Sequence, residues 1–248
     1  MGALDGRVAV VTGGAQGIGL AIAQGLAREG ARIVIADVAR AEEAAAAFPA
    51  GVGLAVDVSS EADVQRMADE TVASCGRIDV LVNNAGLYAS LAMRPFTEIP
   101  LEEWRRVMDV NVASMFLTCR AVVPVMRAHG GGKIVNISSG TPFRGVPFLL
   151  HYVTSKGAIV ALTRALAKEL GKDTILVNCV APGFTMSEGV KQHPEVVEKL
   201  RDVSVSARTL QRDQEPDDVV GAVVFLSGPG SDFVTGQTMV IDGGQFFH

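Results

Sequence analysis

The chemistry in this chain is concentrated in a hydroxyl group and an amine that lie four residues apart. Tyr152 and Lys156 stand at the start of a helix predicted over residues 153–170, so their side chains share one face. A free tyrosine hydroxyl has a pKa of about 10 and is a poor acid or base near neutrality. A neighbouring ammonium group favours the phenolate and lowers that pKa. The pair is therefore typical of a site that moves one proton, although a solvated surface pair has the same spacing.

A second hydroxyl group precedes this pair in a position that suits substrate binding. Ser139 follows an apolar run at residues 133–138, which is short, rich in β-branched residues and typical of a buried strand. Ligands collect where the strands of a parallel sheet end. We expect Ser139 to hold a substrate oxygen while Tyr152 moves the proton.

A glycine-rich turn near the N-terminus has the sequence context of a phosphate site. A strand is predicted at residues 7–12 and a helix at residues 20–29. Between them lie Gly13, Gly14, Ala15, Gln16, Gly17, Ile18 and Gly19. Glycines let the backbone approach a pyrophosphate, and the helix N-terminus offers free N–H groups and positive potential. Glycine also occurs in ordinary tight turns, so the prediction of a phosphate site depends on the strand before this turn and the helix after it.

Asp37 ends a second predicted strand, at residues 32–37, and is followed by Val38. An acid at this place in a dinucleotide-binding unit accepts hydrogen bonds from the adenosine ribose hydroxyls. The same carboxylate repels a 2′-phosphate, so the sequence favours NAD over NADP. Arg40 lies close enough to weaken that preference. The alternative is an ordinary aspartate that caps the next helix.

The remaining elements alternate between strand and helix. Further strands are predicted at residues 52–58, 78–82, 173–180 and 238–241, and helices at residues 39–48, 101–129 and 215–226. This alternation predicts a doubly wound α/β fold, with a seven-stranded parallel sheet flanked by helices on both faces. No repeat or linker divides residues 1–248, which indicates one domain. Residues 188–214 are polar and irregular, with weak helical signals, so a mobile substrate lid is expected at about residues 186–214.

Composition narrows the class of protein further. The chain has 248 residues, a net charge of −5 and three widely spaced cysteines. This charge gives no reason to expect nucleic acid, and the cysteines suggest neither a disulfide framework nor a metal site. The N-terminus leaves no room for a signal peptide, and we expect no apolar run long enough to span a membrane. A cytoplasmic protein is expected.

Taken together, the motifs resemble the short-chain dehydrogenase/reductase family over essentially the whole chain. The pieces that match are residues 12–19 (TGGAQGIG), residues 83–86 (NNAG), Asn111, Ser139, Tyr152-x-x-x-Lys156, and Pro182 with Gly183. Among its members the chain looks like bacterial secondary-alcohol dehydrogenases, through residues 236–244 and His248. The resemblance implies a Rossmann-type fold and an NAD-dependent reaction that interconverts a secondary alcohol and a ketone. It also implies a homotetramer.

The resemblance also implies roles for individual residues. Tyr152 would be the general acid/base, Lys156 would lower its pKa, Ser139 would orient the substrate, and Asn111 would position Lys156 through water. Taken without the resemblance, an asparagine in this apolar neighbourhood is more often structural than catalytic. The cofactor would contact Gly13, Gln16, Gly17, Ile18, Gly19, Asp37, Val38, Asp57, Val58, Asn84, Ala85, Gly86, Tyr152, Lys156, Pro182, Gly183, Thr185 and Ser187.

In one place the sequence departs from the family pattern. The family often has a threonine four residues after the glycine of Pro-Gly, against the nicotinamide amide, but here Ser187 stands there and Thr185 lies two residues earlier. Which of the two groups binds the amide stays open.

The residues expected to line the substrate pocket are mostly apolar, which favours a neutral or aromatic small molecule over a polyanion. They are Tyr88, Ser139, Thr141, Leu149, Phe184 and Met186, with Phe143 and Phe148 as further candidates, and Arg144 and His151 are the charged residues nearby. Plain core packing is the alternative for each.

Two other functions compete with this prediction. An NADP-dependent reductase of 3-oxoacyl-type carbonyls would more often carry a basic residue near Gln16 or after the second strand, where Asp37 and Val38 stand. A non-catalytic NAD sensor or scaffold would not need Tyr152 and Lys156. In the helix after Tyr152, Ala158, Ala161 and Ala165 form a stripe of small residues that faces either the sheet or a partner subunit.

Overall fold

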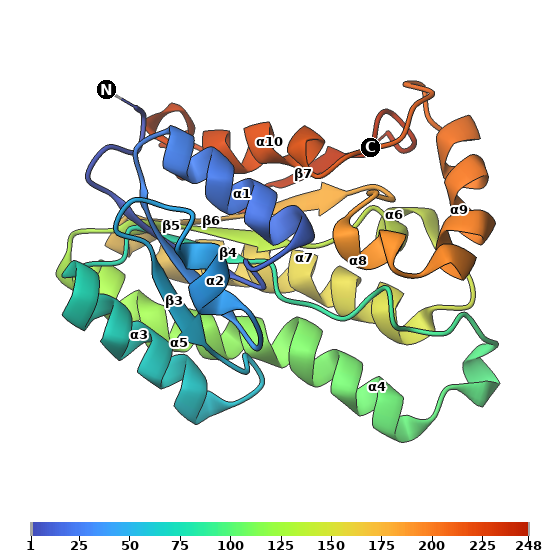
Figure 1. The fold of residues 1–248 in the computed structure, drawn as a ribbon, viewed down its shortest axis with the longest axis horizontal. Coiled ribbons are helices and arrows are strands. Elements are labelled where there is room, and N and C mark those ends of the chain that lie inside the picture. The colour runs from blue at the N-terminus through green and yellow to red at the C-terminus, as the bar shows by residue number, and fades with distance from the viewer. Residues whose placement is uncertain (1, 248) are drawn as a thin grey trace.

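The computed structural model describes residues 2–247, which are built on a parallel sheet of seven strands. The strands lie in the order β3-β2-β1-β4-β5-β6-β7, which confirms the predicted sheet (Figure 1). The order reverses between β1 and β4, and such a switch point is where open α/β sheets bind ligands. The strands are β1 Val8–Thr12, β2 Arg32–Asp37, β3 Val52–Ala55, β4 Val80–Asn83, β5 Gly132–Ile137, β6 Ile175–Pro182 and β7 Thr238–Ile241.

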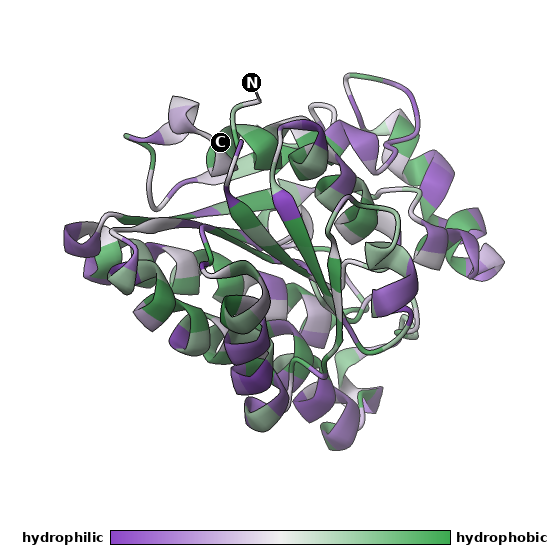
Figure 2. Ribbon diagram, turned by 60° about the vertical axis from the view of Figure 1, so that its left-hand side comes forward, coloured by the Kyte–Doolittle hydropathy of each residue, from purple (hydrophilic) through white to green (hydrophobic). Residues whose placement is uncertain are grey.

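Helices cover both faces of the sheet. Helices α1 (Gly17–Arg28) and α10 (Asp217–Ser227) lie on one face, and α3 (Glu61–Cys75), α5 (Ser114–Ala128) and α7 (Leu150–Leu170) lie on the other (Figure 1). Strand β1 is buried on both faces, because Val10 packs into one core and Val11 into the other. Figure 2 shows the strands mainly in the green of apolar residues, while hydrophilic residues gather on the outer surfaces of the helices.

The other helices vary in length from four to 13 residues. They are α2 Ala41–Ala45, α4 Leu101–Met108, α6 Thr141–Arg144, α8 Glu188–Lys191 and α9 Pro194–Ser206, with 3-10 turns at Phe96–Glu98, Gly171–Asp173 and Pro229–Ser231.

The start of α1 differs from the prediction in a way that matters for the site. The helix begins at Gly17 rather than at residue 20, so half of the glycine-rich segment forms its first turn. Glycine has a poor helix propensity, which made this turn look like loop in the sequence. Strand β2 has the predicted bounds, whereas β3 ends at Ala55, short of residue 58.

The helix predicted over residues 101–129 is interrupted. A π-helical turn, Asp109–Ala113, separates α4 from α5, and Pro124 lies inside α5. The run Leu101–Ala128 is long and apolar enough to cross a membrane by length and composition alone, since it contains an 18-residue window with a mean hydropathy of 1.3. The prediction that no such run exists is therefore wrong. Helix α5 packs against α3 and against strands β4, β5 and β6.

The segment expected to be irregular contains two helices, α8 and α9. Pro194 occupies the first turn of α9, where a proline fits without loss of a hydrogen bond. The weak helical signals in residues 188–214 correspond to these two helices, and the prediction of irregular structure is wrong where they lie. The signals are weak because the helices bury few residues, Val190 in α8 and Ser204 in α9.

Candidate active site

The predicted site residues come together because four parallel strands end at the same edge. Thr12, which ends β1, accepts hydrogen bonds through Oγ1 from the N–H groups of Asn84 at 3.0 Å and Ala85 at 3.1 Å. The Asn84 amide in turn donates to the Gly13 carbonyl at 2.9 Å. The glycine-rich turn and residues 83–86 are therefore fixed to one another at the switch point between β1 and β4.

A cavity of about 700 Å³ opens at this switch point. Its size falls in the ~300–1,000 Å³ range of cofactor and ligand sites. Of the predicted cofactor contacts, it is lined by Gly13, Gln16, Asp37, Val38, Asp57, Val58, Ala85 and Gly86. The lining thus joins the glycine-rich turn, the end of β2, the segment after β3 and the segment after β4.

The N-terminus of α1 fits a bound pyrophosphate. Gln16 is the N-cap residue and makes no side-chain hydrogen bond to the first turn, so the side chain of the cap leaves those N–H groups to other acceptors. Gly17 has a φ of 56°, in the region that glycine tolerates. A side chain on Gly19 would overlap the Gly13 carbonyl oxygen. Glycine is therefore required here to bring the turn close to the cavity.

Asp37 lines this cavity, and two backbone N–H groups orient its carboxylate. Its carboxylate accepts hydrogen bonds from the N–H of Ala15 at 3.1 Å and of Ala39 at 3.3 Å. Asp37 is not the N-cap of α2, because Arg40 occupies that position. The carboxylate is therefore oriented by the turn that would hold the phosphates, as expected of a ribose ligand.

Tyr152 lies in the first turn of α7 and is buried, with 7% of its surface exposed. The side chain of Ser139 lies close enough to oppose the rise that burial causes in the pKa of Tyr152. Ser138, the residue before, donates to the Lys156 carbonyl at 2.6 Å and is structural. The predicted choice of Ser139 over Ser138 agrees with this geometry.

Lys156 and Asn111 both lie close to Gly86, which lines the cavity. A side chain on Gly86 would lie 3.2 Å from Asn111 Oδ1 and 3.5 Å from Lys156 Nζ. Lys156 donates to the Ile137 carbonyl at 2.9 Å. Asn111 lies in the π-helical turn, and its amide binds the backbone of Leu87. The water-mediated link from Asn111 to Lys156 stays a prediction.

Burial dominates the ionisation of this pair in the protein alone. It raises the pKa of Tyr152 to about 12, and it lowers the pKa of Lys156 to about 8. The ammonium of Lys156 lies 5.7 Å from the centre of the tyrosine ring. In the protein alone the ammonium of Lys156 does not offset the burial of the hydroxyl. A lowered pKa of Tyr152 stays a prediction for the site with bound cofactor.

Most of the predicted pocket residues converge on Tyr152. Tyr88 packs on it with ring centres 4.9 Å apart, and Leu149 belongs to the same apolar cluster. Tyr88 also contacts a second cluster, which contains Phe184 and Met186. The N–H of Thr141 donates to Ser139 Oγ at 3.2 Å.

Two of the aromatic candidates lie elsewhere. Phe143 stacks on Phe246, with ring centres 5.4 Å apart, and packs against a different cluster. Phe148 is half exposed.

Comparison with known proteins places this arrangement in a family. A family model described as Enoyl-(Acyl carrier protein) reductase matches residues 13–245. A probable galactose dehydrogenase of Rhizobium meliloti (strain 1021) is 36% identical, over 98% of this chain and 96% of the relative. The chain belongs to the short-chain dehydrogenase/reductase family. It is an oxidoreductase, as the resemblance implied.

Other members of the short-chain dehydrogenase/reductase family cover the chain equally well. A galactitol 2-dehydrogenase of Agrobacterium fabrum (strain C58) is 36% identical over 98% of each chain. The crystal structure of a 3-ketoacyl-(acyl-carrier-protein) reductase from Brucella melitensis, complexed with NADH, superposes with a TM-score of 0.90 at 30% identity. That match covers 98% of this chain and 99% of the other, and it supports a nicotinamide cofactor for this family member.

The departure from the family pattern after Pro182 and Gly183 has a structural consequence. Ser187 caps α8 by accepting a hydrogen bond from the N–H of Val190 at 3.4 Å, and it lies against Gly17 of the glycine-rich turn. Thr185 is buried, and its hydroxyl donates to the Gly183 carbonyl at 3.1 Å. Both hydroxyls are therefore engaged within the chain, and the choice between them stays open.

The charged wall of the cavity was not among the predicted site residues. Glu102, Arg105 and Arg106 of α4 line it together with Asp109 of the π-helical turn. Their spacing at positions i, i+3, i+4 and i+7 places them on one helix face, and this signal is readable from the sequence.

Proposed function

We propose that the protein transfers a hydride between NAD(H) and a secondary alcohol or its ketone, with Tyr152 as the general acid/base. The observation that supports this most is that Ser139 and Lys156 both lie close to Tyr152, while Lys156 also lies beside Gly86, which lines the same cavity as Asp37. The bound nicotinamide supplies the hydride acceptor or donor. The residues of the chain align the substrate and move one proton.

In the proposed reaction, Ser139 donates a hydrogen bond to the substrate oxygen and Tyr152 exchanges the proton with it. Lys156 holds the nicotinamide ribose and adds positive charge beside the phenol. Cofactor contacts are proposed for the glycine-rich turn, the end of β2, and the segments after β3, β4 and β6. These are Gly13, Gln16, Gly17, Ile18, Gly19, Asp37, Val38, Asp57, Val58, Asn84, Ala85, Gly86, Pro182, Gly183, Thr185 and Ser187.

The preference for NAD over NADP is proposed from the charges around Asp37. Its carboxylate would accept from the ribose hydroxyls and repel a 2′-phosphate. Arg40 is the cation that would favour NADP, but it donates to Gln16 Oε1 at 2.6 Å and lies 4.0 Å from Glu188. The guanidinium is therefore already engaged by an amide and a carboxylate.

The substrate is proposed to be a neutral alcohol with further hydroxyl groups. Tyr88, Leu149, Phe184 and Met186 supply apolar walls. Among the described residues, Thr141 Oγ1 and Arg144 Nε are buried without a hydrogen-bond partner. Substrate hydroxyls both donate and accept, so they would pair with such groups. The relatives named for galactose and galactitol are consistent with this class.

We further propose a cytoplasmic homotetramer with a lid at about residues 186–214, which contains α8 and α9. Ala161 and Ala165 of α7 are exposed and face away from the sheet. Phe116 of α5 is also exposed, with Arg120 over its ring. Together these residues suit contact with another subunit. All three cysteines are free thiols, which fits a reducing compartment. His248 lies outside the described residues.

A substrate panel tests the proposal. Initial rates are measured for polyols, aromatic secondary alcohols and 3-oxoacyl thioesters, each with NAD(H) and NADP(H). We expect turnover of alcohols and their ketones with NAD(H). Turnover restricted to 3-oxoacyl thioesters with NADPH would favour the reductase that the Brucella relative's name describes. Cofactor binding without turnover of any substrate would favour a sensor or scaffold.

A further inference from the structure

The backbone of Tyr152 is held on both sides by side chains. Its N–H donates to Nδ1 of His151 at 3.0 Å, and its carbonyl accepts from Oγ of Ser155 at 2.7 Å. Leu149, the N-cap residue of α7, makes no side-chain hydrogen bond to the helix. His151 therefore satisfies an N–H group that a helix terminus otherwise leaves without a partner.

The hydrogen bonds fix which nitrogen of His151 carries the proton. A backbone N–H only donates, so Nδ1 must accept and is unprotonated. In the neutral ring the proton is then on Nε2, which lies 2.8 Å from Glu103 Oε1 and donates to it. His151 is fully buried, while the side chain of Glu103 is one-quarter exposed. Glu103 thus sets the orientation of the imidazole ring.

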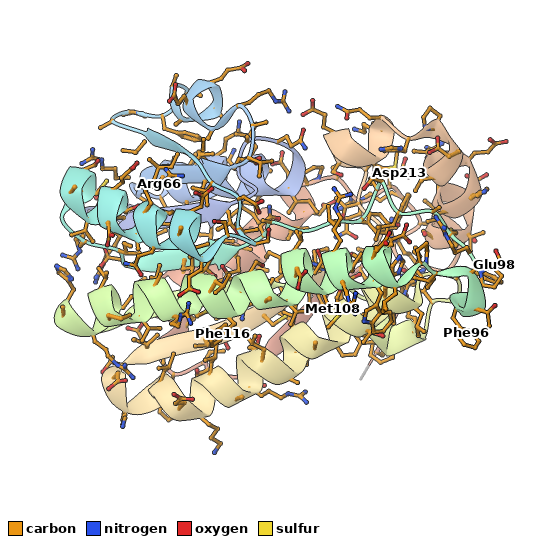
Figure 3. The ribbon with its side chains drawn as sticks, turned by 90° about the horizontal axis from the view of Figure 1, so that it is seen from below. Arg66, Phe96, Glu98, Met108, Phe116 and Asp213 are labelled. Atoms are coloured by element: carbon orange, nitrogen blue, oxygen red, sulfur yellow. The ribbon has the colours of Figure 1, made fainter. Side chains whose placement is uncertain are left out.

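Both contacts to Tyr152 are anchored from the same helical run. Glu103 lies on α4 and holds His151, while Asn111 lies in the following π-helical turn and donates to Ser155 Oγ at 3.0 Å. Figure 3 shows α4, the π-helical turn and α5 as one continuous helix beside α7, with Met108 at the junction. The turn of α7 that carries Tyr152 is therefore fixed at its start and its end by α4 and the π-helical turn.

The Glu103 anchor is itself connected to the loop before α7. The guanidinium of Arg94 lies 3.4 Å from Glu103 Oε2, and the backbone N–H of Arg94 donates to the Phe148 carbonyl at 3.0 Å. The carboxylate of Glu103 thus contacts both His151, in the first turn of α7, and Arg94, which binds the loop before α7. No part of the proposed proton transfer uses His151 or Glu103 directly.

We infer that His151, oriented by Glu103, is a positioning residue that holds the Tyr152 hydroxyl where the proton is transferred. This inference rests on the proposed function. A shift of the first turn would move the phenol relative to Ser139 without removing any group that binds the cofactor. The expected signature is a loss in kcat with little change in KM or in the affinity for NADH.

Two substitutions separate the two hydrogen bonds of His151. Asparagine places its Oδ1 near the position of Nδ1 and keeps the acceptor for the Tyr152 N–H. Glutamine places its amide near Nε2 and keeps the contact with Glu103 alone. We expect His151→Ala to lower kcat at least tenfold, His151→Gln to behave like His151→Ala, and His151→Asn to recover part of the loss.

The Glu103 variants test the orientation of the ring. Glu103→Gln keeps a carbonyl oxygen as acceptor, so kcat should stay within threefold of wild type. Glu103→Ala removes the acceptor and should lower kcat about as much as His151→Ala. An equal loss in Glu103→Gln and Glu103→Ala would contradict the assigned tautomer.

A control variant distinguishes positioning from general loss of stability. Thr163 is buried further along α7, where it accepts from Asn136 at 3.0 Å, far in sequence from Tyr152. Thr163→Val should lower the unfolding midpoint while kcat per folded molecule stays near wild type. The His151 variants should lower kcat more than Thr163→Val does at a comparable midpoint.

Amide hydrogen exchange gives a readout that does not depend on turnover. Exchange at the Tyr152 amide should accelerate in His151→Ala and His151→Gln, and less in His151→Asn. Wild-type kcat in His151→Ala, or an unchanged Tyr152 amide in a variant with lowered kcat, would overturn the inference. If wild-type protein turns over no substrate, the proposed function fails instead, and the exchange measurement still tests the hydrogen bond.

Discussion

Lys156 Nζ lies 5.7 Å from the centre of the Tyr152 ring, and both side chains are buried. Burial favours the neutral form of each group, so the pKa of Tyr152 rises to about 12 and the pKa of Lys156 falls to about 8. In the protein without cofactor, the pKa of Tyr152 is therefore too high for efficient proton transfer near neutrality. A bound cationic nicotinamide would favour the phenolate, so cofactor binding and proton transfer are coupled.

The ionisation of Lys156 predicts how stability depends on pH. The folded pKa of Lys156 is about 8, below the unfolded value of 10.5, so between these values the unfolded chain binds more protons and stability rises with pH. Below about pH 8 the full cost of burying the ammonium is present. Lys156→Met removes that cost and keeps the apolar volume.

Thermal unfolding without cofactor measures this effect. We expect Lys156→Met to unfold at a higher temperature than wild type at pH 7, and the difference to shrink by pH 10. A difference that stays constant over this range would show that Lys156 is not buried as an ammonium group.

Asp37 should control the choice of cofactor. Hydrogen bonds to a charged group contribute roughly 1.5–3 kcal/mol, which corresponds to tenfold or more in affinity. Asp37→Ala should therefore weaken NADH binding about tenfold or more and bring the affinities for NADH and NADPH together. Fluorescence titration of both cofactors measures the ratio. An unchanged ratio would assign Asp37 a structural role through Ala15 and Ala39.

Gly19 should be essential for the shape of the phosphate turn. A methyl group there would overlap the Gly13 carbonyl and lie 2.5 Å from Asn84 Nδ2, so the turn has to move. Gly19→Ala should weaken NADH binding about tenfold or more, because it displaces the N–H groups of α1.

Gly221 supplies the matched control for Gly19. It is exposed in the interior of α10, and an added methyl group meets nothing within 4 Å. Gly221→Ala should bind NADH like wild type and gain roughly 0.5–1 kcal/mol of stability, because alanine suits a helix interior better than glycine does. Equal NADH affinity in the two variants would contradict the proposed phosphate turn.

Much of the fold follows from patterns that depend on local sequence. Strand β2 and strand β7 have the predicted bounds, because apolar β-branched runs bounded by turn residues carry a strong signal. The order of the motifs also predicted the approach of Ser139 to Tyr152, since parallel strands end at one edge. Local propensity misplaced the start of α1, because Gly17 and Gly19 are poor helix formers. Gly19 packs closely against Gly13 and Asn84, and Gly17 lies against Ser187.

What the sequence did not predict depends on contacts across the fold. The hydrogen bond of His151 to Glu103 joins residues 48 positions apart, and no spacing rule indicates it. The π-helical turn that aims Asn111 toward Ser155 has no signature in composition. The pKa of Tyr152 follows from burial, which the four-residue spacing to Lys156 did not reveal.

The central claim is that the Tyr152 hydroxyl transfers the proton in a reaction on bound nicotinamide. The most direct test measures kcat of Tyr152→Phe with the best substrate of the panel, together with its affinity for NADH. General acid/base catalysis contributes roughly 10²–10⁴-fold, so kcat should fall at least a hundredfold while the affinity for NADH changes little. A variant that keeps more than about a tenth of wild-type kcat would contradict that role.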